Sequence, residues 1–350
     1  MPEPALRALL AGHWYDALAA LLQSGQGVVG TPEQRRQAYA LAGAAKRVLD
    51  LDAEDFGTIA EGFRTRWASR LAQSCFPLQP RDQERGALRS LVPLYELMLE
   101  VTQLRAERHE PLQVVVTAHL IGEYLCQLAW ESVLGHGGDP LHMGETVGER
   151  WGTDDPLCPH NSAMRATAKR SLHACTGDVA GYTAYLDKFH SRLGDTLAVC
   201  AMNHATIGAG QRPDVGATCP HPCRWATMWP MPTRRDLDAR VRLALLYVDS
   251  PIVSLRHHAP VGHFFGVPSV QEISAAWLQT WQRLTQPWKD GENPLLSAPI
   301  AGAAPPDEAL PGLATLVSTV AGRTIGPGRV IRSIGEEITA LLDEAGVGRE

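Results

Sequence analysis

The sequence lacks the features that mark several classes of protein. It has no excess of basic residues, and its net charge is −6 at pH 7. Phosphate binding needs clustered positive charge, so we expect no nucleic-acid partner. No unbroken apolar run approaches the ~18 residues of a membrane-spanning helix, so no membrane partner is expected. The first residues, Met1-Pro2-Glu3-Pro4, lack the basic region of a secretory signal. These absences together predict a cytoplasmic protein.

Cysteine and the common catalytic motifs are scarce as well. Seven cysteines in 350 residues is a small and odd number, so a disulfide framework is not expected. The chain contains no G-x-G-x-x-G after a strand, no P-loop, no G-x-S-x-G elbow and no H-E-x-x-H. The sequence therefore offers no standard motif for dinucleotide binding, nucleotide hydrolysis, acyl transfer or zinc proteolysis.

The sequence pattern is that of a folded helical protein. Hydrophobic residues make up 45% and charged residues 20% of the chain, which is the balance of a folded globular protein. Apolar residues recur every three or four positions, and no long segment alternates as a strand does. We therefore predict an all-α fold, a multi-helix single large domain with little or no sheet. Helices are expected at about 5–23, 31–49, 53–74, 82–108, 112–134, 163–174, 178–192, 195–206, 233–247, 269–284, 309–321 and 329–345.

Segments rich in glycine and proline divide the chain. We expect two long ordered loops, at 135–162 and 208–232, and an irregular segment at 251–268. The domain prediction has three parts: a mainly helical catalytic or cofactor domain (1–286), a Pro/Gly/Ala linker (287–307), and a C-terminal helical segment that packs on the core (308–350). All histidines except His13 lie between positions 109 and 263, as do all cysteines except Cys75. The metal-binding residue types are thus concentrated in the middle of the chain.

The densest group of such residues is the segment Cys219-Pro220-His221-Pro222-Cys223. Proline restricts the backbone, so the three side chains are presented with little freedom. Thiolate and imidazole suit zinc, and Cys158-Pro159-His160 in the first loop could add two more ligands. The alternative is a rigid loop that carries free thiols.

A second candidate is the segment from Arg256 to Pro268. His263 stands between Gly262 and the pair Phe264 and Phe265. Glycine permits the close approach of a flat ligand, aromatic rings suit the wall of a cofactor pocket, and an imidazole there could be an axial ligand of haem iron. Arg256 could pair with a carboxylate. The alternative is a core turn whose histidines bind backbone groups.

A third candidate is His119 with Glu123, on the apolar helix predicted at 112–134. Their spacing of four residues puts both side chains on one helix face. A buried imidazole oriented by a carboxylate is a common arrangement around an acid–base group. The alternative is a core pair whose hydrogen bonds satisfy each other.

In size and helical, His-rich texture the chain resembles the haem-dependent tyrosine hydroxylases, peroxygenases in the group of haem-dependent aromatic oxygenases. One branch of that group attaches haem through a His-x3-Cys motif, with a second histidine about forty residues earlier. Here His263 to Val267 is similar to that motif with valine in place of the cysteine, and His221 lies at a similar upstream distance. The resemblance implies haem b without a covalent link.

On this interpretation the chain is a haem-dependent oxidoreductase that hydroxylates a small aromatic, tyrosine-like substrate in natural-product (antibiotic) biosynthesis. His263 would be the axial ligand, with Phe264 and Phe265 beside the haem. His221 or His258 would be the distal group, and Arg256 would anchor a carboxylate. The sequence is compatible with a homodimer. The alternative is a non-enzymatic helical interaction protein with structural zinc at Cys219, His221 and Cys223.

Overall fold

Helices make up the regular structure of the chain in a computed structural model, and no strand occurs among the residues that it describes. Those residues are 3–25, 30–77, 79, 85–146, 179–184, 229–258, 266–288, 292–298 and 309–347. The all-α prediction is therefore confirmed.

In chain order the elements are α1 (Glu3–Ala11), α2 (Tyr15–Ser24), α3 (Pro32–Leu49), η1 (Ala53–Asp55), α4 (Phe56–Glu61), α5 (Arg66–Gln73), α6 (Gly86–Arg89), α7 (Val92–Glu107), α8 (Pro111–Glu123), α9 (Leu125–Leu134), α10 (Pro140–Thr146), α12 (Val179–Ala184), α16 (Met231–Val248), α17 (Pro251–Ser254), η5 (Leu255–His258), α18 (Val270–Leu284), α19 (Pro294–Ser297), α20 (Leu313–Ala321) and α21 (Val330–Val347).

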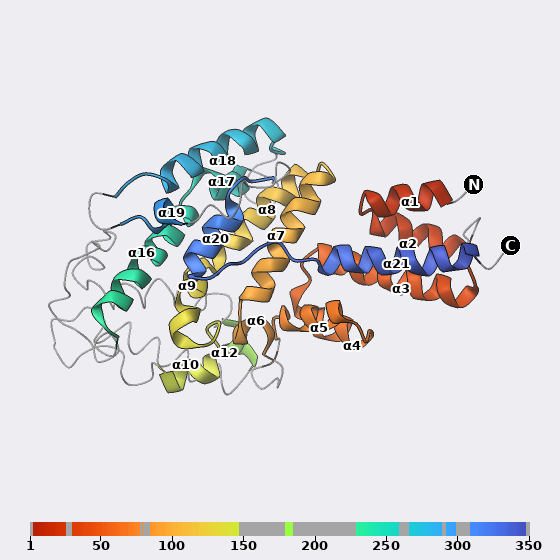
Figure 1. The fold of residues 1–350 in the computed structure, drawn as a ribbon, viewed down its shortest axis with the longest axis horizontal. Coiled ribbons are helices and arrows are strands. Elements are labelled where there is room, and N and C mark those ends of the chain that lie inside the picture. The colour runs from red at the N-terminus through yellow and green to blue at the C-terminus, as the bar shows by residue number, and fades with distance from the viewer. Residues whose placement is uncertain are drawn as a thin grey trace.

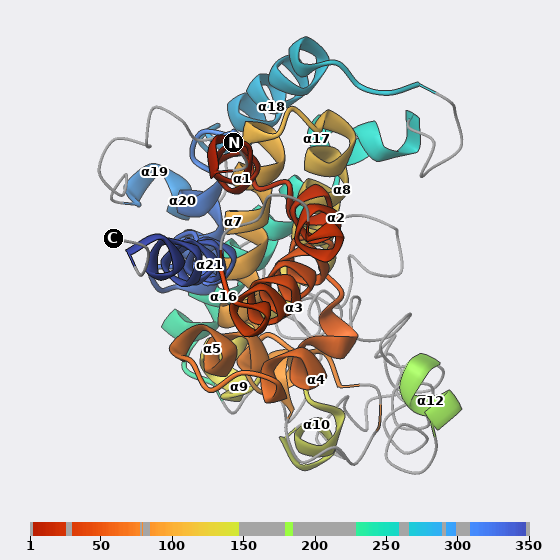
Figure 2. The same ribbon diagram turned by 90° about the vertical axis from the view of Figure 1, so that its right-hand side faces the viewer.

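The helices enclose two hydrophobic cores. The larger core draws its buried side chains mainly from α7, α8, α9, α16, α18 and α20, and the smaller one from α1 to α5, α7 and α21. Figure 1 shows the two groups at opposite ends of the long axis, with α7 between them. Figure 2 shows α3 and α21 side by side at the end that holds the smaller core.

Helix α7 belongs to both cores. Tyr95 and Met98 pack into the larger core, whereas Leu97, Val101 and Leu104 pack into the smaller one. A helix that is apolar on opposite faces must be buried on both. The helix predicted at 82–108 therefore does not present a polar face to solvent along α7, which lies between the two cores and packs against both. Its proline, Pro93, lies in the first turn of α7, where the missing N–H costs no hydrogen bond.

The stretch Pro111–Leu134 forms the centre of the larger core. The apolar pattern predicts a single helix at 112–134, whereas the structure has two, α8 and α9, which meet at Tyr124. In the described part of the chain it is the one helical stretch long and apolar enough to cross a membrane, but most of it is covered by other helices. That burial is compatible with the core helix of a soluble protein.

A tertiary contact divides the helix predicted at 5–23. The chain turns between α1 and α2, where His13 has a positive φ of 55°. The guanidinium group of Arg108 lies 4.1 Å from the ring centre of Trp14 and also contacts the backbone carbonyl of His13. Because Arg108 lies almost a hundred residues away, the local apolar pattern could not reveal the break.

Other boundaries differ for similar reasons. The helix predicted at 53–74 is divided into η1, α4 and α5. The described part of the loop predicted at 135–162 contains α10, and the segment predicted as irregular at 251–268 contains α17 and η5. The described part of the predicted linker contains α19, where Leu295 is buried. Helix α16 begins at Met231, two residues before the predicted start.

Two helices begin with capping boxes whose residues lie close together in the sequence. Thr31 and Gln34 form a capping box at the start of α3, and Ser269 and Glu272 form one at the start of α18. At the other end of the chain, α20 packs against α9 and α16, while α21 packs against α3. The C-terminal segment therefore contributes to both cores.

Candidate functional site

Most of the predicted site residues lie outside the residues that the structure describes. This applies to Cys219, His221 and Cys223, to the segment from His263 to Phe265, and to the side chain of His258. The zinc loop and the axial histidine therefore stay predictions. Arg256, His119 and Glu123 are described, and they come together.

Arg256 joins the His119–Glu123 pair from a different part of the chain. Nε2 of His119 lies 2.8 Å from Oε1 of Glu123, which confirms that the two side chains share a face of α8. Nη1 of Arg256, on η5, contacts the same Nε2. Elements α17 and η5 both pack against α8, so the packing of these elements places the guanidinium beside the imidazole.

Within this group, Glu123 is more exposed to solvent than His119. The Glu123 side chain is 38% exposed and the His119 side chain 13% exposed. The second ring nitrogen of His119, Nδ1, is buried and has no hydrogen-bond partner among the residues that the structure describes. A ligand that approaches from solvent therefore reaches Glu123 first and Nδ1 last.

The contacts of Nε2 are in conflict. A guanidinium only donates hydrogen bonds and an ionised carboxylate only accepts them, while a ring nitrogen does one or the other. If Nε2 carries the proton, it donates to Glu123 and leaves Nδ1 as a buried acceptor. If Nε2 accepts from Arg256, the proton of a neutral ring sits on Nδ1. The imidazole therefore has two proton arrangements, each favoured by one neighbour.

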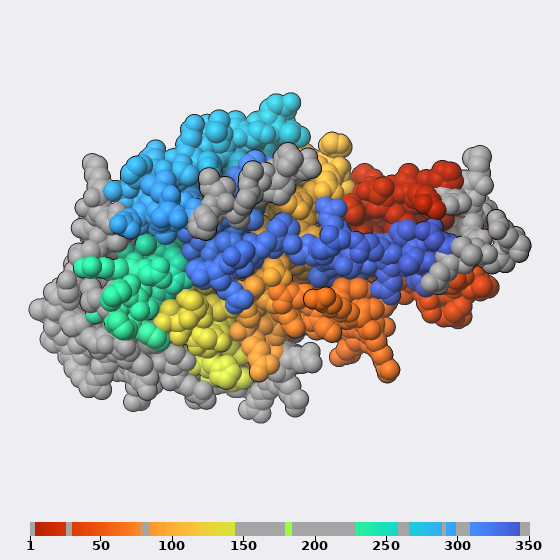
Figure 3. Space-filling view, in the orientation of Figure 1, coloured from red at the N-terminus to blue at the C-terminus, as the bar shows by residue number. Residues whose placement is uncertain are grey.

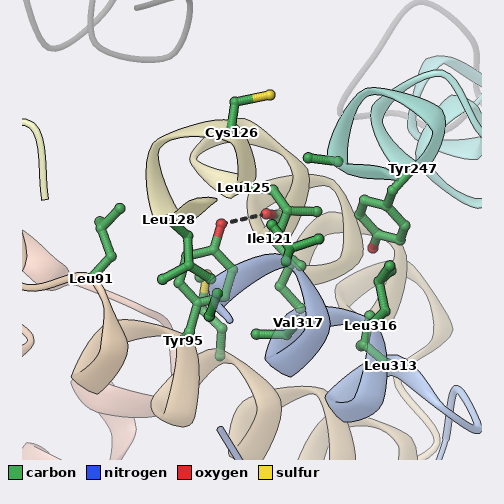
Figure 4. Packing of buried hydrophobic residues seen from close by; sticks show 14 of the residues in the cluster. Leu91, Tyr95, Ile121, Leu125, Cys126, Leu128, Tyr247, Leu313, Leu316 and Val317 are labelled. Atoms are coloured by element: carbon green, nitrogen blue, oxygen red, sulfur yellow. Dashed lines mark hydrogen bonds between the residues drawn. The ribbon is translucent and has the colours of Figure 1, made fainter. Parts of the chain in front are cut away.

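Two buried tyrosines hold α8 in place beneath this group. The hydroxyl of Tyr95 donates to the carbonyl of Ile121 at 2.7 Å, as Figure 4 shows, and that of Tyr247 donates to the carbonyl of Ala118 at 2.8 Å. Burial raises the pKa of both tyrosines, so both stay neutral donors. Helix α8 is thereby fixed on two sides, which gives His119 and Glu123 a rigid base.

An apolar cavity of about 480 Å³ lies beside another face of α8. Leu120 and Tyr124, the residues that follow His119 and Glu123, form part of its wall. The remaining lining residues are Leu51, Asp52, Ala53, Glu54, Phe76, Leu94, Met98 and Thr183. Its volume and apolar wall are those of a small-molecule site.

A second polar cluster, around His136, follows α9. Arg85 and Asp139 form a buried bidentate ion pair at 2.7 and 2.8 Å. Nδ1 of His136 accepts hydrogen bonds from the backbone N–H groups of Gly138 and Asp139. Burial lowers the pKa of His136 to about 4, so the ring is neutral and Nε2 carries its proton. Because a protonated Nε2 cannot ligate a metal, His136 holds the turn that leads into α10.

The sequence does not predict the Arg85–Asp139 pair. Its members lie fifty-four positions apart, and neither residue belongs to a recognisable motif. No group of three or more metal-ligating side chains occurs within the described ranges. The two cysteines in those ranges, Cys75 and Cys126, are not bonded to each other. No family model, no curated protein and no solved structure matches this chain.

Proposed function

We propose that the chain is an enzyme that acts on a small aromatic molecule bearing a carboxylate, and that Glu123, His119 and Arg256 form its polar site. The observation that carries the proposal is the contact of one imidazole nitrogen with both a carboxylate and a guanidinium. A structural pair needs only one such partner. Two competing partners give the proton of His119 two positions, which is a useful property in an acid–base group.

Each residue has a separate role in this site. Arg256 binds the substrate carboxylate through the guanidinium N–H groups that His119 does not use. Glu123, which is more exposed than His119, exchanges a proton with the substrate. His119 lies behind it and takes or returns that proton through Nε2. His119 is therefore a positioning and relay residue, and its buried Nδ1 does not touch the substrate.

The resemblance to haem-dependent tyrosine hydroxylases makes the proposal more specific. A tyrosine-like substrate combines an aromatic ring with a carboxylate, and haem would supply the iron that activates the oxidant. Nε2 of His119 is already engaged, so His119 does not fit as axial ligand and that role stays with His263. Arg256 fits as the partner of a propionate or of the substrate carboxylate. His221 or His258 would be the distal group.

We further propose a cytoplasmic location. The small, odd number of cysteines fits a reducing compartment, and the burial of Pro111–Leu134 in the larger core fits a protein outside the membrane.

The role of Arg256 can be tested with L-tyrosine and tyramine, which differ by the carboxylate. In calorimetric titrations, wild-type protein is expected to bind L-tyrosine at least about tenfold more tightly, which corresponds to ~1.4 kcal/mol. Arg256→Gln should bring that ratio to about one. Arg283→Gln, an exposed change on α18, is the control and should keep the preference. Equal binding of both compounds by wild type would refute the proposed role.

The cofactor is tested in the same preparation. Haem titration should give a stoichiometric complex with a Soret band in wild type, and His263→Ala should lose it. If wild type takes up no haem, the haem proposal is wrong. Bound zinc, with a melting temperature that falls on chelation in wild type but not in Cys219→Ser, would then favour the interaction protein with a structural zinc.

A further inference from the structure

A groove lined by arginines lies where α5 packs against α6 and against the start of α21. It consists of two adjoining cavities of about 750 and 550 Å³ that share Ser69 and Gln73 as walls. Figures 1 and 3 show α5 lying along the first part of α21 at this place. No carboxylate lines either cavity in the part of the chain that the structure describes.

Helix α5 supplies one wall through its spacing. Ser69 and Arg70 lie three and four positions after Arg66, and Gln73 lies four and three positions after them. This spacing puts all four side chains in one stripe on the helix surface. The opposite helices add Arg89 and Ser90, from the end of α6, and Arg329 and Ser333, from the start of α21. With Arg85, which also lines the α6 end, the groove combines five guanidinium groups with three serine hydroxyls.

The charge of these arginines is only partly compensated. Arg70 is held by Glu96, with Nε 3.0 Å from the carboxylate, and Arg329 by Glu336 at 2.6 Å. The second pair is exposed, and such pairs bind weakly. Arg66 and Arg89 form no ion pair with any described residue. The charged residues among the described lining residues are thus all arginines, on a chain whose net charge is −6.

The backbone beneath the α6 end of the groove is rigid. Gly86 has a φ of +45°, and a Cβ at this position would lie 2.0 Å from the carbonyl oxygen of Cys75. Its neighbour Arg85 is fixed by the buried ion pair with Asp139. A wall that does not rearrange loses little entropy when a ligand binds, so the groove is preorganised.

We propose that this groove binds a phosphorylated small molecule. Guanidinium groups match the oxygens of a phosphate in pairs. The hydroxyl of Ser333 adds a single hydrogen bond, whereas those of Ser69 and Ser90 already donate to Thr65 and Glu131. Cavities of this volume accommodate a small molecule. The chain's net negative charge and the confinement of the arginines to one short groove disfavour nucleic acid, which needs an extended basic surface. This site is independent of the proposed enzyme site.

The test uses sodium tripolyphosphate as probe, in calorimetric titrations at low ionic strength. Wild-type protein is expected to bind it with a micromolar Kd. The double variant Arg66→Gln/Arg89→Gln should weaken binding about tenfold or more, because it removes the two groove arginines that pair with no described carboxylate. Glu336→Gln should tighten binding severalfold, since it releases Arg329 from a competing carboxylate. Arg235→Gln/Arg283→Gln removes the same charge from exposed positions outside the groove and should leave the Kd unchanged.

Several results would overturn the proposal. One is a wild-type Kd for tripolyphosphate above about 1 mM. The others are an unchanged Kd in Arg66→Gln/Arg89→Gln, and equal weakening of binding in Arg235→Gln/Arg283→Gln. Tighter binding of a 20-nucleotide single-stranded DNA than of tripolyphosphate would also overturn it, in favour of nucleic acid. Circular dichroism of each variant confirms the fold, and Arg66 and Arg89 are both exposed, so their replacement leaves the cores intact.

Discussion

Glu100 shows how one buried residue joins distant parts of the chain. Its carboxylate lies on α7 and is fully buried. It accepts backbone hydrogen bonds from Val330 at 2.8 Å and Arg332 at 2.9 Å, in the first turn of α21. Those N–H groups lack partners within their own helix, so Glu100 caps α21 from 230 positions away. Burial raises its pKa to about 7, although the backbone hydrogen bonds oppose the shift.

This shift predicts the pH dependence of stability. The pKa of Glu100 is higher in the folded than in the unfolded protein, so its contribution to the free energy of unfolding is complete below about pH 4.5 and is lost as pH rises through about 7. The full loss is up to about 3 kcal/mol. Glu100→Gln should remove this part of the pH dependence. Urea unfolding of both proteins at pH 5 and pH 8 measures it.

The exposed Glu33 is the control for this prediction. Its side chain pairs with Arg36 at the surface, so Glu33→Gln should keep the wild-type difference between pH 5 and pH 8. If Glu100→Gln also keeps that difference, Glu100 does not titrate in this range and the expectation is wrong.

At the scale of the helices, local signals set many starts but few ends. The capping boxes of α3 and α18 are visible in the sequence, because the donor and acceptor groups lie three residues apart. The ends of α1 and α8 are not visible in the sequence in this way. The first depends on Arg108 stacking over Trp14, and the second falls at Tyr124 inside a continuous apolar pattern.

The cap of α18 gives a prediction at this scale. Ser269→Ala removes the hydroxyl that accepts from the backbone N–H of Glu272 and should lower the free energy of unfolding by about 1 kcal/mol. Ser274→Ala lies in the same helix, where the hydroxyl only donates to the carbonyl of Val270. That control should change stability by less than ~0.5 kcal/mol. Equal losses in both variants would rule out a cap effect. Urea unfolding measures each.

At the scale of the whole molecule, α7 connects the two cores. Its side chains pack into both, so neither core can lose its packing without exposing part of the same helix. Helix α21 strengthens the connection, since it packs on α3 and is capped by Glu100 of α7. The described parts of the chain should therefore unfold as one cooperative unit.

Two matched leucine substitutions test this cooperativity. Leu41 lies in the smaller core and Leu316 in the larger one, and both are almost completely buried. Replacement of either by alanine should cost ~2–5 kcal/mol and lower the temperature of one common calorimetric transition. Two transitions, of which each variant shifts only one, would show instead that the cores unfold independently.

The sequence by itself determined the all-α class, the caps of α3 and α18, and the shared face of His119 and Glu123. These features depend on residues a few positions apart, and helical spacing places such residues together. Tertiary structure alone decided that Arg256 meets His119, that Glu100 caps α21 and that the arginines of three helices line one groove. The partners in these contacts lie up to 263 positions apart, as Arg66 and Arg329 do. Only the packing of helices against two cores brings such residues within contact, because no local pattern specifies a partner so far along the chain.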